Sequence, residues 1–167
     1  MPQSQGLYSR HETRPGPLAS QCGLAGMHTT ILVRPGSARD FPAVTRIQRR
    51  CPETAQWPMG DYAGFPILIA LLDETPAGFC SWRQSTPGEA ELLNLAVDPA
   101  FRRQGVASAL LNSLAGQARG EIFLEVAEPN DAARSLYRKH GWEDIGIRRG
   151  YYHHGTVNAV VMKKSSW

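Results

Sequence analysis

The stretch "AVDPAFRRQGVASALL", residues 96–111, restricts the fold of this chain more than any other. An apolar run ends at Asp98-Pro99, a polar loop with a lone glycine follows, and a helical pattern of apolar residues then begins. A strand that turns into a helix in this way leaves the first N–H groups of the helix without intrahelical partners. Together with the helix dipole, these groups favour a bound anion.

Several residues around this helix start suit a phosphate or pyrophosphate. Arg102 and Arg103 add positive charge, Gly105 lets an anion approach the backbone, and Ala107 keeps the next turn narrow. The alternative is an ordinary helix start with solvated arginines. The chain has neither GxxxxGK[ST] nor a GxGxxG that follows a strand, which argues against P-loop and dinucleotide-binding folds.

Apolar periodicity predicts one mixed α/β (α+β) domain of six to seven strands and about four helices. The segment 89–98 is apolar on both faces and should be the central strand. The two strands before it, flanking 73–78, should form a hairpin. Strands are predicted at 29–35, 66–73, 77–85, 89–98, 121–127, 142–152 and 156–164, helices at 38–50, 105–119 and 130–141, and a short helix or loop at 51–62.

Composition excludes several classes of protein. The 167 residues carry a net charge of only +3, and their basic residues are scattered, which argues against a nucleic-acid partner. The longest apolar run, residues 65–72, is too short to cross a bilayer, so no membrane partner is expected. The first 26 residues, rich in Pro, Gly, Ser and Arg, are expected to be a disordered extension, with the functional domain at 27–167.

The cysteines and histidines do not form a metal-binding pattern. Cys22, Cys51 and Cys80 are widely spaced, with no CxxC pair, which argues against a disulfide framework or a zinc site and fits the reducing cytoplasm. His153 and His154 are predicted to lie in a solvated loop. We therefore expect no metal.

Three segments in order, "NLAVDPAFRRQGVASALL", "IFLEVAEPNDAARSLYRKHGW" and "GIRRGYY", resemble the GNAT N-acetyltransferase superfamily. Within it, the chain is most similar to bacterial ribosomal-protein N-terminal alanine acetyltransferases. The likeness runs from about Glu91 to Lys163 and more loosely back to Met27. It implies a GNAT fold with a single mixed, mostly antiparallel and splayed sheet. It also implies direct transfer of acetyl from acetyl-CoA to a primary amine in a ternary complex, with a ribosomal-protein N-terminus as the favoured acceptor.

The resemblance also implies a binding site for acetyl-CoA. The pyrophosphate would bind at the helix start, and the pantetheine arm along the end of the central strand. The backbone near Leu95 becomes a candidate oxyanion donor, and Asn130, which can cap its helix, a further cofactor contact. The implied cofactor-binding residues are Leu95, Ala96, Val97, Arg102, Arg103, Gln104, Gly105, Val106, Ala107, Asn130 and Tyr137.

Two residues match the proton-transfer groups of the family. Glu125 lies in an apolar strand, where a carboxylate is costly unless paired. The resemblance makes it the base, acting directly or through water, and the alternative is a strand-end glutamate paired with an arginine. Tyr137 matches the general acid that protonates the departing thiolate. By pattern alone, it would be a core tyrosine.

The acceptor side is less well defined. Tyr151 and Tyr152 are predicted to lie in the turn before the last strand, where relatives hold a peptide backbone, but exposed aromatic pairs are also common. Trp57 is a wall of the acceptor site or a cover for the core. Glu91 and Asn94 line the acceptor site or have hydrogen-bonded structural roles.

Two other functions remain open. A same-fold enzyme could acetylate a small amine or a lysine side chain. A protein of another class could bind acyl-CoA without catalysis, and the presence of both Glu125 and Tyr137 argues against it.

Overall fold

The computed structural model describes residues 29–165, so the expected extension at 1–26 lies outside the described residues. Its strands form one seven-stranded sheet in the order β1-β2-β3-β4-β5-β7-β6. Every neighbouring pair is antiparallel except β4–β5, which confirms the predicted mixed sheet. The strands are β1 (Ile31–Pro35), β2 (Ile67–Leu72), β3 (Thr75–Thr86), β4 (Glu89–Val97), β5 (Glu121–Ala127), β6 (Glu143–Tyr152) and β7 (Val157–Ser165).

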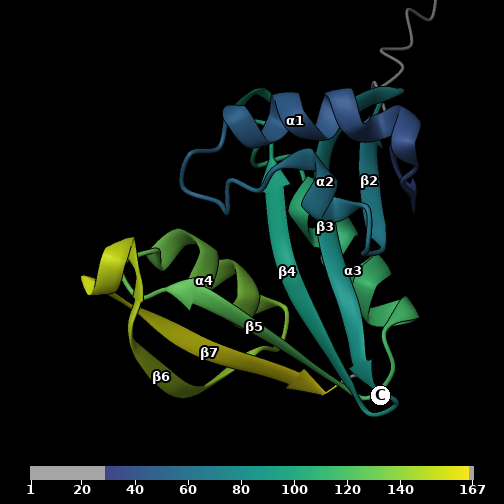
Figure 1. Cartoon of the computed structure of the whole chain (residues 1–167). Helices are drawn as coiled ribbons and strands as arrows, with labels where there is room; N and C mark the ends of the chain where they lie inside the picture. The colour runs from purple at the N-terminus through teal and green to yellow at the C-terminus, as the bar shows by residue number, and fades with distance from the viewer. Residues whose placement is uncertain (1–28, 166–167) are drawn as a thin grey trace, which may run out of the picture.

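Helices lie on both faces of this sheet (Figure 1). One hydrophobic core lies beneath α3 and α4, and a second lies between α1, α2 and the strands β2 to β4. No helix within residues 29–165 is long and apolar enough to cross a membrane. The helices are α1 (Phe41–Arg49), α2 (Met59–Tyr62), α3 (Val106–Gln117) and α4 (Asp131–Lys139), with 3-10 turns η1 (Ala38–Asp40), η2 (Pro99–Phe101) and η3 (His153–Gly155).

The parallel strands β4 and β5 pair over only part of their length. Residues Glu89 to Leu92 of β4 are in register with Glu121 to Leu124 of β5, and no pair follows. Both strands continue beyond this point, and they diverge into the two arms seen in Figure 1. The predicted splayed sheet is therefore confirmed.

A β-bulge changes the direction of β4 where the two strands separate. Ser81 pairs with Asn94 and Trp82 with Leu92, so Leu93 is an extra residue on β4. Leu92 packs in the α3–α4 core, whereas Ala96, beyond the bulge, packs in the α1–α2 core. The bulge thus changes which residues of β4 face each core.

The β2–β3 turn is tighter than predicted. Only Asp73 and Glu74 form it, with φ angles of 46° and 69°. Two consecutive positive φ values match the twist of an antiparallel pair, so the predicted turn residues 75–78 join β3 instead. A register shift beside Ala70 accommodates Pro76 in that strand.

In place of the helix predicted at 38–50, the structure has the 3-10 turn η1 followed directly by α1. Hydrogen bonds hold the carboxylate of Asp40 where the two meet. Arg34 donates to its two oxygens at 3.0 and 2.8 Å, and the Ser37 N–H donates at 2.8 Å. Asp40 is only 8% exposed. The hydrogen bond from Arg34, opposed in part by burial, lowers the pKa of Asp40 from 3.8 to about 2.

We expect Asp40→Asn to lower the free energy of unfolding at pH 7 by about 1–2 kcal/mol. The pKa of Asp40 is lower in the folded protein than in the unfolded chain. The stabilisation that its carboxylate contributes is therefore complete above pH 3.8 and is lost as the pH falls through about 2. Urea unfolding measures the free energy of unfolding at pH 7, where this stabilisation is complete, and at pH 2, where most of it is lost. Asp61→Asn, at an exposed position, should change little. If Asp40→Asn lowered the free energy of unfolding as much at pH 2 as at pH 7, the stabilisation would not come from the ionised carboxylate.

Candidate active site

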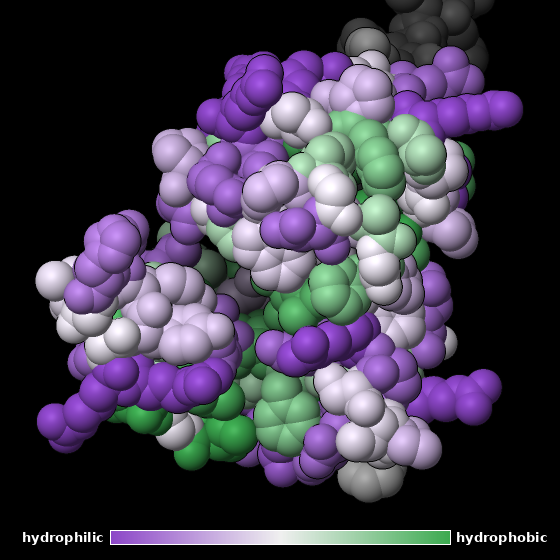
Figure 2. All heavy atoms as spheres, viewed as in Figure 1, coloured by the Kyte–Doolittle hydropathy of each residue, from purple (hydrophilic) through white to green (hydrophobic). Residues whose placement is uncertain are grey.

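A cleft of about 210 Å³ occupies the gap between the diverging strands. The view in Figure 2 shows the surface hollowed between the two arms. The cleft brings together six residues that the sequence singled out, from the central strand, β5, α4 and the end of β6. It is lined by Pro52, Glu53, Thr54, Ala55, Leu92, Leu93, Asn94, Leu95, Leu124, Glu125, Val126, Ala127, Asn130, Ala133, Tyr137, Tyr152 and His153.

The start of α3 has the geometry expected of an anion site. Gly105 is the N-cap with φ 88°, a left-handed conformation that favours glycine. The N–H of Ala109 bonds to the Gly105 carbonyl at 3.0 Å, so the amides of Val106 and Ala107 precede the helical ladder. These amides are the groups that could hold a phosphate.

The side chain of Arg102 binds the protein itself. Its Nε donates to the Val97 carbonyl at 3.1 Å, and its terminal nitrogen forms an ion pair with Glu53. Arg102 therefore ties the segment 52–55, which lines the cleft, to the end of β4. Arg103 is exposed with φ 62°, and Gln104 donates to the Ala100 carbonyl within the same loop.

The three residues predicted to meet pantetheine have different environments. Leu95 lines the cleft. Ala96 is 1% exposed and packs in the α1–α2 core. The Val97 carbonyl already accepts from Arg102 and from the Cys51 thiol at 3.2 Å. Of the three, Leu95 has the clearest access to a ligand.

Glu125 is the first residue of β5 beyond its last pair with β4. Its side chain is 16% exposed and forms an ion pair with Arg148 of β6, whose side chain is 58% exposed. The Tyr152 hydroxyl donates to the Glu125 carbonyl at 3.1 Å. The carboxylate thus lies at the separation point, held by groups from β6.

Tyr137 lines the same cleft from α4 and is 8% exposed. Its ring packs against Trp142, with centroids 5.8 Å apart. Burial raises the pKa of Tyr137 above the ordinary value for a phenol, which already lies well above neutral pH. Asn130, also in the cleft, caps α4 by accepting from the Ala133 N–H at 3.1 Å.

Asn94 has a structural role in addition to lining the cleft. Its amide donates to the Ala55 carbonyl at 2.9 Å and to the Tyr62 hydroxyl at 2.6 Å. Tyr62 in turn donates to Gln48 at 2.5 Å, and burial raises its pKa to about 12. This network holds the segment 52–55 over the cleft.

Two other predicted acceptor residues lie outside the cleft. The ring of Trp57 packs against Tyr62 and Phe65, at centroid distances of 5.3 and 6.3 Å, beside the α1–α2 core. Glu91 forms an ion pair with Arg83 at 2.6 Å, on the sheet face that carries neither α3 nor α4.

The prediction that Tyr151 and Tyr152 lie in the turn before the last strand was wrong. Both belong to β6, and Tyr152 pairs with Val157 of β7. The reversal is made instead by η3, where His153 and His154 have φ angles of 51° and 55°. His153 and His154 are exposed in this turn, as the predicted solvated loop required, and β6 ends at the limit predicted for the strand 142–152.

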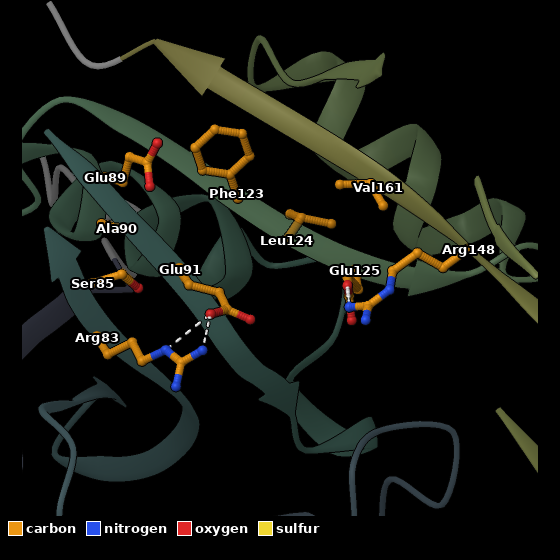
Figure 3. Close-up of a pocket in the computed structure, with 10 residues that line it drawn as sticks. All are labelled: Arg83, Ser85, Glu89, Ala90, Glu91, Phe123, Leu124, Glu125, Arg148 and Val161. Carbon is orange, nitrogen blue, oxygen red and sulfur yellow. Dashed lines mark hydrogen bonds and ion pairs between the residues drawn. The ribbon is translucent and has the colours of Figure 1, made fainter. Parts of the chain in front are cut away.

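A wider hollow, which we call the open-face basin, adjoins Glu125 on the sheet face away from α3 and α4. It has a volume of about 410 Å³. Figure 3 shows Arg148 directed at Glu125 and Arg83 directed at Glu91. The basin is lined by Arg83, Ser85, Glu89, Ala90, Glu91, Phe123, Leu124, Glu125, Arg148 and Val161.

Sequence reasoning missed Arg83 and Glu53. It raised an arginine partner for Glu125, which the structure shows, but did not identify it as Arg148. Arg148 stands within the motif "GIRRGYY", but only the register of β6 against β7 brings it to Glu125. In the part of the chain that the structure describes, no group of three His, Cys, Asp or Glu side chains could hold a metal ion.

We expect Gly105→Ala to weaken binding of CoA about tenfold or more, because the backbone relieves the strain of a side chain at φ 88° by moving the amides that follow. Isothermal titration with CoA measures the change. Gly116→Ala, in the same helix with open space around it, should bind CoA normally and be slightly more stable. Equal affinities of both variants would exclude the α3 start as the anion site.

Comparison with known proteins agrees with this geometry. N-alpha-acetyltransferase RimI of Mycobacterium tuberculosis is 38% identical over 91 residues, 54% of this chain and 58% of that protein. The [ribosomal protein bS18]-alanine N-acetyltransferase of Salmonella typhimurium is 34% identical, over 75% of this chain and 91% of its own. The crystal structure of the ribosomal-protein-S18-alanine N-acetyltransferase from Escherichia coli matches with a TM-score of 0.71 and 27% identity, over 82% of this chain and 94% of that one.

The matched stretch thus spans less than two thirds of the mycobacterial relative, but nearly all of the Salmonella one. The family model for the acetyltransferase (GNAT) family matches residues 36–142, from the end of β1 through α4. This range holds the start of α3, the diverging strands and both Glu125 and Tyr137. The chain therefore belongs to the acetyltransferase (GNAT) family.

Proposed function

We propose that this protein transfers the acetyl group of acetyl-CoA to the N-terminal α-amine of a protein, with a ribosomal protein as the acceptor. The observation that carries the proposal is that Glu125 and Tyr137 line one cleft, where β4 and β5 separate. Relatives named as ribosomal-protein bS18-alanine N-acetyltransferases support the choice of acceptor. Such an acceptor would place the reaction in the cytoplasm.

The chain offers a continuous path for acetyl-CoA. The amides of Val106 and Ala107 would hold the pyrophosphate at the start of α3. The pantetheine arm would follow the free edge of β4 at Leu95, where pairing with β5 has ended. Asn130 would contact the arm from the start of α4.

The first proton transfer prepares the amine for attack. An α-amine is largely protonated near neutral pH, so a base must accept a proton before nitrogen can form a bond to the acetyl carbon. Glu125, one of the two glutamates that line the cleft, would accept this proton, directly or through water. The backbone near Leu95 would then stabilise the oxyanion of the tetrahedral intermediate.

The second proton transfer completes the reaction. When the intermediate collapses, the bond between carbon and sulfur breaks and the CoA thiolate takes the electron pair. Tyr137 would supply a proton to this sulfur, since its hydroxyl, whose pKa burial raises, carries its proton at neutral pH. No covalent enzyme intermediate is needed.

We expect Tyr137→Phe and Glu125→Gln each to lower kcat about 100-fold or more while CoA binding stays within about threefold. The measurement is acetyl transfer to a synthetic peptide with N-terminal alanine, followed by mass spectrometry, with CoA affinity from titration calorimetry. Thermal unfolding should show that both variants are folded.

Parallel assays with a free lysine side chain and with small amines test the acceptor class. Turnover of these amines but of no peptide would contradict the proposed acceptor. Full activity of the double variant would exclude both assigned roles. CoA binding without any transfer by the unmodified protein would instead indicate a non-catalytic module.

A further inference from the structure

The ion pair between Arg148 and Glu125 places an internal cation on the carboxylate proposed as the base. The same carboxylate also interacts with Tyr151. Their hydrogen bond is the main cause of the raised pKa of Tyr151. Both partners come from the end of β6, and Tyr152, next in sequence, donates to the Glu125 backbone. A cationic acceptor amine that contacts this carboxylate directly would therefore displace a cation that is already there.

We propose that Arg148 is a gate on the acceptor side of the site. Its guanidinium occupies the place on Glu125 that the acceptor ammonium takes, and it moves aside when the acceptor enters from the open-face basin. The proposal rests on the proposed function, because it takes Glu125 as the group that meets the amine. Arg148 acts here through Glu125 and is a positioning residue.

The surroundings of Arg148 allow this movement. Its side chain is 58% exposed, whereas that of Glu125 is 16% exposed, so the cation faces solvent and the carboxylate faces the site. The guanidinium carbon also lies 4.7 Å from the centroid of the Tyr151 ring, which offers a second partner when Glu125 is taken. Figure 3 shows the side chain reaching Glu125 from the edge of the basin.

The backbone of β6 is irregular at the gate. The register against β7 shifts between Arg148 and Tyr152, so the residues between them are not held in a regular ladder. Gly150, within this shift, has φ 60°. Arg148 is thus the last residue in regular register before the irregular segment, on an edge strand that is exposed along nearly all its length.

The test is the effect of Arg148→Gln on the acceptor KM in acetyl transfer to a peptide with N-terminal alanine. Removing the competing cation should lower this KM about two- to fivefold, the range expected for a mostly exposed ion pair. The kcat should stay within twofold, and the KM of acetyl-CoA should not change. Calorimetric titration of the unacetylated peptide into the CoA-bound enzyme should show a matching gain in affinity.

Arg83→Gln is the matched control. It removes the same charge from the same basin and breaks an exposed pair with Glu91, but leaves the Arg148–Glu125 pair in place. A KM for Arg148→Gln that is unchanged or higher would overturn the gate, as would an equal fall in Arg83→Gln. Turnover of the peptide by the unmodified enzyme tests the proposed function separately, because the gate is judged only from the ratio between variant and unmodified protein.

Discussion

The separation of β4 from β5 after Leu92 and Leu124 is the constraint on which the rest of the site depends. Had the parallel ladder continued, the facing N–H and C=O groups of the two strands would have satisfied one another and left no cleft. Because it stops, these groups face the gap and need other partners. An extended ligand that carries amides, such as a pantetheine arm, can supply them in the manner of an added strand.

The gap is kept open by packing on both sides of the sheet. Leu92 and Ala96 of β4 belong to different cores, so β4 is packed from both faces of the sheet where it leaves β5. On the face of α1, Asn94 holds Ala55 over the cleft. On the other face, Ser108 of α3 and His140 beyond α4 lie within hydrogen-bonding distance at 2.9 Å and join the helices across the divergence.

The parts of this fold that follow from local chemistry were predictable from the sequence. Asn130 and the glycine after α4 marked a helix whose cap is observed, and β5 was predicted with its observed limits. The family resemblance located Glu125 and Tyr137, and the structure places both in one cleft.

What could not be predicted depends on register between distant strands. Arg148 is 23 residues from Glu125, and only the β5–β7–β6 order brings the two together. The place of Trp57 could not be predicted either, because an aromatic residue near prolines has the same sequence pattern whether it packs in a core or lines a site. The tight turn at Asp73-Glu74 escaped prediction because non-glycine residues rarely adopt positive φ.

The placement of Glu125 and Tyr137 divides the proposed reaction between the two faces of the sheet. Tyr137 belongs to the core beneath α3 and α4, on the side where α3 offers its amides to a phosphate. Glu125 borders the open-face basin, where Arg148 and solvent can reach it. In the proposed reaction, the thioester therefore enters from one face and the amine from the other, and they meet where the strands part. Burial raises the pKa of the phenol further above neutral pH, and the carboxylate keeps contact with charged groups because its side of the gap is open.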